Sequence, residues 1–180
     1  MKRLTGFTML TAAVMSTAVS LLMLFAASIC PVVPVCCVCL FVASIMTWVP
    51  VREENGYLFA LIAFLVTSGA ALLICGGIYT YLYILLFGHF GIVYYFLRRR
   101  VQDDVLRWML VLLYCNVMTA IGLALAQYVF GYDLQTLTPW FPVWALILIL
   151  EAAFAVFCVL YHFCCDLFDT HVRKAILPRR

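Results

Sequence analysis

Hydrophobic runs, each about as long as a membrane-spanning helix, alternate with short polar segments along the chain. A helix that crosses the hydrocarbon layer needs about 20 mostly apolar residues, and runs of this kind recur from Leu4 to Phe163. The pattern predicts six spanning helices followed by a basic tail at residues 164–180. The predicted helices cover about residues 4–29, 32–49, 57–74, 78–97, 105–130 and 140–163.

Prolines and glycines set the boundaries between these helices. Pro31 and Pro34 separate the first two helices and Pro50 ends the second, since proline is tolerated in a first turn but breaks a helix interior. The apolar run at 57–97 is about twice as long as one span needs, and the Cys-Gly-Gly sequence at 75–77 divides it. We therefore expect an all-α, six-transmembrane-helix bundle that forms a single integral membrane domain.

Composition agrees with a lipid environment. Hydrophobic residues make up 68% of the 180 residues, and charged residues make up only 11%. A soluble domain carries about a quarter charged residues because its surface faces water. Lipid must therefore surround this chain, and the net charge of +3 does not indicate a nucleic-acid partner.

The basic residues predict the orientation. All 11 lysines and arginines fall in four clusters: near the N-terminus, at Arg52, between residues 98 and 107, and in the C-terminal tail. With six spans these clusters share one side, and basic residues prefer the cytoplasmic side. We expect both termini in the cytoplasm and the chain in the cell (inner or plasma) membrane. The first 30 residues resemble a secretory signal, but their apolar stretch exceeds the usual length of about 7–15 residues, so a retained first helix is favoured.

Three polar residues fall at membrane depth, where polar side chains are costly and tend to mark function. His89, Asn116 and Glu151 would meet near the bilayer midplane if the fourth, fifth and sixth helices adjoin, given a rise of about 1.5 Å per residue. Glu151 would then lie about 18–20 Å from the cytoplasmic edge. Such a group could bind a cationic or hydrogen-bonding solute, relay a proton, or serve as a purely structural network.

Small residues recur at every fourth position of the first helix: Thr8, Ala12, Ser16 and Ser20. Small side chains let helix backbones approach closely in lipid. This stripe predicts either packing inside the bundle or docking to another membrane subunit.

Cysteines allow two other interpretations. Cys158, His162, Cys165 and Asp169 share one helical face, but zinc ligands usually come from tight turns or several elements, so packing is favoured and no metal is expected. Cys36 and Cys39 have the C-x-x-C spacing of redox pairs, which keeps a membrane thiol oxidoreductase as an alternative. The sequence has no nucleotide-binding, metalloprotease or hydrolase motif. We therefore expect neither an enzyme nor a cofactor.

One run of residues suggests a family. The segment Leu85-Leu-Phe-Gly88-His-Phe-Gly91, leading into Arg98-Arg-Arg100, resembles the substrate-binding S components of energy-coupling factor (ECF) transporters, in particular their S-component-like membrane family. The six spans, the prolines before the second helix, and the pairs Asn55-Gly56 and Gly76-Gly77 add to the likeness.

The resemblance implies a six-helix subunit that captures a vitamin-like molecule from outside and works with a transmembrane coupling protein and two cytoplasmic ATPases. The coupling protein would dock on the small residues of the first helix. Ligand contacts would lie toward the outer half, with Asn116 and Glu151 beneath them. The candidate contact residues are Tyr79, Tyr83, Gln127, Tyr132, Asp133 and Trp144.

Two other classes remain as alternatives. Rod-shape-determining membrane protein D is similar in size and number of spans, and a scaffold of that kind would need no ligand pocket. Its usual Pro-Asp near the start of the second helix is absent here, because Val35 follows Pro34. An enzyme acting on lipid is the third alternative, and the sequence offers no recognisable nucleophile and base for it.

Overall fold

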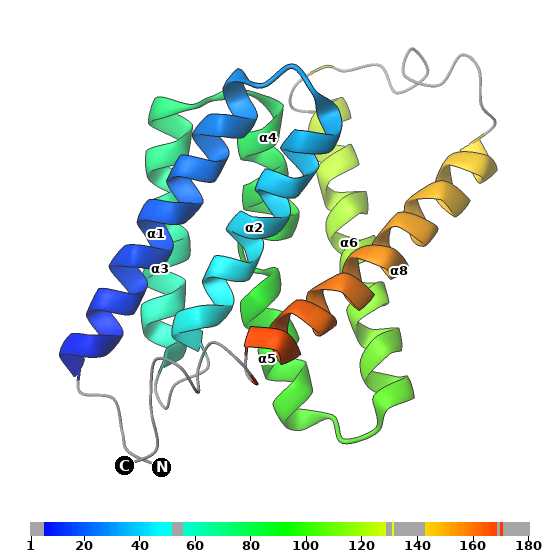
Figure 1. Cartoon of the computed structure of the whole chain (residues 1–180). Coiled ribbons are helices and arrows are strands. Elements are labelled where there is room, and N and C mark those ends of the chain that lie inside the picture. Colours follow the sequence, from blue (N-terminus) through cyan, green and yellow to red (C-terminus); the bar gives the residue numbers. More distant parts are fainter. Residues whose placement is uncertain (1–5, 52–55, 129–130, 132–142, 169, 171–180) are drawn as a thin grey trace. The chain divides into compact units, whose positions relative to one another are not determined.

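The computed structural model describes residues 6–51, 56–128, 131, 143–168 and 170, and the elements found there are all helices (Figure 1). Within this part of the chain, six helical segments are long and apolar enough to cross a membrane: Met9–Ile29, Val33–Val51, Gly56–Ile74, Gly77–Arg100, Asp104–Leu125 and Ile147–Leu167. The predicted all-α fold with six spans is confirmed. The chain is a multi-pass membrane protein.

The chain divides into two compact units, Met1–Asp103 and Asp104–Arg180. Unit 1 contains α1 (Gly6–Ile29), α2 (Val33–Val51), α3 (Gly56–Ile74), α4 (Gly77–Leu82), the π-helical turn η1 (Tyr83–Phe87) and α5 (Phe90–Arg100). Unit 2 contains α6 (Asp104–Tyr128) and α8 (Val143–Leu167). The arrangement of the whole chain as a single domain stays a prediction.

In unit 1, α1 lies against α2 and α3 through small side chains (Figure 1). Spacings of three and four residues keep side chains on one helical face, and the buried row on α1 follows that spacing: Ala13, Ser16, Ser20, Leu24 and Ala27. The predicted stripe at every fourth residue drifts around the helix by about 40° per step. It shares only Ser16 and Ser20 with the buried row. Ala12 is half-buried, and the side chain of Thr8 lies outside the described residues.

Pro50 lies within the last turn of α2, so the predicted end of this helix at residue 49 is wrong. Proline has no N–H, and the carbonyl four residues earlier therefore loses its helical hydrogen bond. That carbonyl belongs to Met46, and it accepts a hydrogen bond from Ser16 Oγ of α1 instead. Because α1 supplies the missing donor, α2 continues through the proline to Val51.

The fourth span is not the uniform helix predicted over residues 78–97. It starts after Gly76 and Gly77, whose φ angles of 57° and 78° suit glycine. It then passes from α4 into η1, where Gly88 N donates to Tyr83 O at 2.6 Å, and a turn at Gly88 and His89 precedes α5. A π-helical turn inserts an extra residue into a helix. Here it accompanies the full burial of Tyr83 in the core of unit 1.

Several helix ends also differ from the prediction. Arg98, Arg99 and Arg100 were predicted in a loop, but they form the last turn of α5. Cationic side chains are favourable there because the C-terminal end of a helix carries partial negative charge. Likewise, α8 continues past residue 163 to Leu167, so the beginning of the predicted tail is helical.

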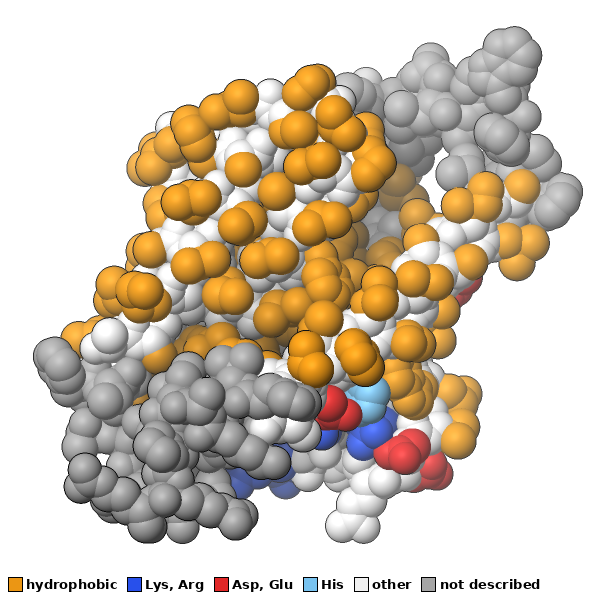
Figure 2. Space-filling model, viewed as in Figure 1, with side chains coloured by type: hydrophobic (Ala, Val, Ile, Leu, Met, Phe, Trp, Pro, Cys, Tyr) orange, Lys and Arg blue, Asp and Glu red, His pale blue; other side chains and the backbone are white. Residues whose placement is uncertain are grey.

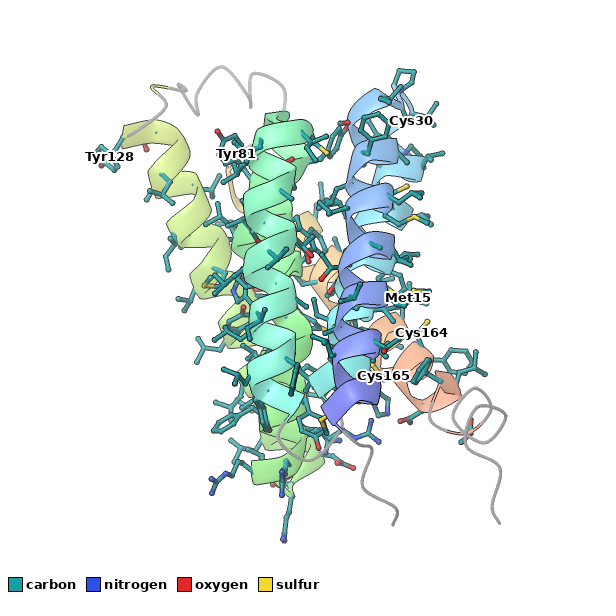
Figure 3. The ribbon with its side chains drawn as sticks, turned by 90° about the vertical axis from the view of Figure 1, so that its left-hand side faces the viewer. Met15, Cys30, Tyr81, Tyr128, Cys164 and Cys165 are labelled. Atoms are coloured by element: carbon teal, nitrogen blue, oxygen red, sulfur yellow. The ribbon has the colours of Figure 1, made fainter. Side chains whose placement is uncertain are left out.

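The exposed surface of the helices is largely apolar, as expected for a chain surrounded by lipid. Hydrophobic side chains cover most of the helical surface seen in Figure 2. Large exposed apolar side chains occur on every span, and Leu73 of α3 is 89% exposed. A soluble monomer rarely exposes apolar patches of this extent. In unit 1, Cys30 and Tyr81 lie toward the same end, with Met15 farther toward the opposite end (Figure 3).

Candidate functional site in the spanning helices

In unit 2, α6 and α8 run antiparallel, and α8 crosses α6 obliquely (Figure 1). The edge of the Trp108 ring meets His162 with 5.8 Å between ring centroids. Farther along the pair, the thiols of Cys115 and Cys158 interact with each other, and both residues are buried. These contacts fix which faces of the two helices meet.

The main polar contact of this helix pair joins Asn116 and Glu151. Asn116 Nδ2 donates a hydrogen bond to Glu151 Oε1 at 2.6 Å, and both side chains are half-buried. A hydrogen bond to an ionised carboxylate is roughly twice as strong as one between neutral groups. The structure therefore brings together two members of the predicted polar trio.

This pair lies deep within the helices. Asn116 is in the middle of α6, about 18 Å from either end at 1.5 Å per residue. Glu151 lies about 24 Å from the Leu167 end of α8 and about 12 Å from the Val143 end. Glu151 is thus farther from the basic end than expected, because α8 is longer than predicted. A carboxylate at such a position is costly in lipid.

The carboxylate of Glu151 has capacity for another partner. Its Oε1 accepts the bond from Asn116, whereas its Oε2 accepts no hydrogen bond from any described residue. An ionised carboxylate offers about four acceptor positions. A ligand that brings a positive charge or N–H and O–H donors would satisfy the remaining positions.

His89, the third member of the predicted trio, belongs to unit 1. It lies at the turn before α5, and its ring centroid is 5.5 Å from that of Phe64. A contact between His89 and the Asn116–Glu151 pair stays a prediction.

The candidate ligand contacts nearer the outer side are distributed over both units. Tyr83 is fully buried, with Ser20 and Thr67 beside its hydroxyl, which favours a role in the core. Tyr79 packs against the buried cluster that contains Cys36, and Gln127 is exposed near the end of α6. Tyr132, Asp133 and the side chain of Trp144 lie outside the described residues.

The cysteine patterns gain little support from the geometry. Within the described part of the chain, no three His, Cys, Asp or Glu side chains are arranged to hold a metal ion. Asp169 lies outside that part, and His162 Nε2 is 3.4 Å from Asp166 Oδ2. Cys36 and Cys39 are free, buried thiols, and Cys36 Sγ donates to the Ala27 carbonyl at 3.4 Å.

Sequence reasoning missed one feature, a cavity of about 690 Å³ lined by Tyr57, Phe96, Arg99 and Arg100. The sequence feature that could have indicated this cavity is the run of three arginines at the end of one span, together with an aromatic residue at the start of another. Without the structure, nothing in the sequence showed that these helix ends adjoin.

No family model matches the chain, and neither a curated protein nor a solved structure is significantly similar to it.

Proposed function

We propose that this protein is a membrane-embedded binding subunit for a small cationic or hydrogen-bonding solute, with Asn116 and Glu151 in its binding site. The hydrogen bond between these two side chains carries the proposal. Asn116 orients one carboxylate oxygen, and the other oxygen keeps its capacity for a ligand. Ionisable residues inside a membrane are rare because they are costly, and they commonly mark the path or site of a substrate.

The wider role in this proposal is that of an S component in a vitamin importer of the ECF type, located in the cell membrane. The chain would bind the solute, while a transmembrane coupling subunit and cytoplasmic ATPases would supply the energy. The six spans are compatible with this role, and so is the lack of a nucleotide-binding motif in the sequence. The identity of the partner subunits comes from the sequence resemblance alone.

A structural scaffold is the second candidate, and one observation favours it. In one apolar 18-residue stretch of the α6 span and one of the α8 span, only 11% of the residues are buried. A bond between Asn116 and Glu151 would therefore be a large part of what joins these helices. Hydrogen bonds between spans commonly stabilise membrane bundles, by about 0.6 kcal/mol on average.

The substitution Glu151→Gln separates the two candidates. Glutamine keeps an oxygen that can accept the bond from Asn116, but it removes the negative charge. If the pair binds a solute, we expect retention to fall at least about 10-fold, because a hydrogen bond to a charged group contributes about 1.5–3 kcal/mol. Stability should change little. If the pair is structural, Glu151→Gln should resemble the wild type and only Glu151→Ala should lower stability.

The measurement is native mass spectrometry of the gently purified full chain, which detects retained small molecules and co-purifying subunits. Asp104→Asn is the matched control, since it also removes one carboxylate but at the exposed start of α6. Wild-type retention by Glu151→Ala would remove Glu151 from the site. A preparation with no retained solute and no coupling subunit would contradict the importer proposal.

A further inference from the structure

The missed cavity lies at the end of unit 1 where the last turn of α5 meets the first turn of α3. Its walls are Tyr57, Phe96, Arg99 and Arg100, and its volume is about 690 Å³. Both arginines are exposed, and neither forms an ion pair with another described residue. The cavity therefore presents two positive charges next to two aromatic rings.

Aromatic contacts order three of the four residues that line the cavity, Tyr57, Phe96 and Arg100. The Arg100 guanidinium carbon is 5.8 Å from the centroid of the Phe96 ring, a distance at which a cation is attracted to a ring face. Tyr57 contacts Tyr95 with 5.5 Å between centroids, and Tyr95 contacts the buried Trp48 at 5.4 Å. A ligand that enters walls ordered in advance loses less free energy to their ordering.

The chemistry of the cavity suits a phosphate. A guanidinium group matches phosphate geometry with two parallel hydrogen bonds, and the cavity offers two such groups. The Tyr57 hydroxyl, which lies within electrostatic reach of Arg99, adds a further donor. Among the described residues that line the cavity, none is acidic.

Its position and size favour a lipid over a free ion. The arginines end a membrane span, which is the level at which lipid headgroups lie, and basic pockets at the cytoplasmic ends of spanning helices bind anionic headgroups. Pockets for small organic ligands measure about 300–1,000 Å³, so this cavity has room for a headgroup and its glycerol. We propose that this cavity binds the phosphate headgroup of an anionic phospholipid in the leaflet on the arginine-rich side.

The test is native mass spectrometry of the full chain from nanodiscs that contain phosphatidylglycerol and phosphatidylcholine. We expect the wild type to retain phosphatidylglycerol in preference. One basic residue at a membrane surface contributes about 1 kcal/mol to the binding of anionic lipid, which is about five-fold in retention. Arg99→Gln and Arg100→Gln should therefore each lower this retention about five-fold, and the double variant about 25-fold. Arg107→Gln is the matched control, because it removes the same charge from a residue paired with Asp104, and it should change retention less than two-fold.

Three results would overturn the proposal. Equal losses for Arg107→Gln and the double variant would show a general attraction of charge, and unchanged retention in the double variant would exclude the cavity. Displacement of the lipid by millimolar inorganic phosphate would show a site for the free anion. Circular dichroism confirms that each variant is folded. If the double variant does not fold, the single variant Arg100→Gln tests the proposal, with an expected loss of retention of about five-fold. This variant should fold, because the ring contact described for Arg100 is limited to Phe96.

Discussion

Replacing Ser16 with alanine tests how unit 1 accommodates a proline inside a membrane span. Ser16 Oγ donates to the Met46 carbonyl, which has no helical donor because residue 50 is proline. Ser16 is 4% exposed, so neither water nor lipid can replace the lost hydroxyl. The variant should therefore leave an unsatisfied acceptor between α1 and α2.

The expected cost follows from the state of that carbonyl. Burying an unsatisfied polar group costs about 1–3 kcal/mol, whereas hydrogen bonds between membrane helices contribute about 0.6 kcal/mol on average and at most about 1.7. We expect Ser16→Ala to lower the free energy of unfolding by about 1.5 kcal/mol. In a Pro50→Ala background, the new N–H reaches Met46 O. The same substitution should then cost about 0.5 kcal/mol, which leaves a coupling of about 1 kcal/mol.

Reversible unfolding with sodium dodecyl sulfate in mixed micelles, followed by circular dichroism, measures these free energies. Ser20→Ala is the matched control: its hydroxyl donates to the Ala43 carbonyl at 3.3 Å, and that carbonyl also receives the helical N–H of Thr47. The control should cost about 0.5 kcal/mol, near the average for such bonds. Equal costs of Ser16→Ala in the wild-type and Pro50→Ala backgrounds would refute the reasoning.

The remaining predictions concern packing, topology and a surface ion pair. A Cβ on Gly88 would lie 2.5 Å from the Phe64 ring, so Gly88→Ala should destabilise unit 1 by about 1–3 kcal/mol in the same unfolding assay. Cysteines placed at Arg52 and Arg99 should react with an impermeant thiol reagent only after the cells are opened, because basic residues face the cytoplasm; labelling of intact cells would contradict this orientation. Asp104→Ala should change stability by no more than about 1 kcal/mol, because the Asp104 carboxylate that pairs with Arg107 is exposed to solvent.

Hydrophobic run length was enough to predict the helices, since lipid permits few alternatives to a helix for an apolar stretch of this length. The order of the six spans was correct, and so was the division of the long apolar run at Gly76 and Gly77. One error arises where a contact between helices overrides a local rule. Pro50 does not end α2 because Ser16, far away in the sequence, compensates for its missing N–H.

The interior of the fourth span shows the same limit. A hydropathy pattern cannot distinguish a uniform helix from one that contains a π-helical turn, because both are apolar over the same length. The change at Tyr83 depends on a core in which its ring is fully enclosed. For the candidate site, similar depths along the helices predicted that Asn116 and Glu151 would meet, and the hydrogen bond between them agrees with this. Depth alone could not establish the place of His89.

The Asn116–Glu151 pair of unit 2 differs from the serine and threonine hydroxyls in both units that donate to main-chain carbonyls, and this difference bears on where a ligand can bind. In unit 1, the hydroxyls of Ser16, Ser20 and Thr67 donate to main-chain carbonyls, so exchanging their partners would disturb helix backbones. In unit 2, Asn116 donates to a side-chain carboxylate that retains acceptor capacity. A carboxylate can change partners by rotating, and the helices stay intact when it does. If Glu151 binds a solute as proposed, substitutions of the unit 1 hydroxyls should alter stability, whereas Glu151→Gln should alter ligand retention.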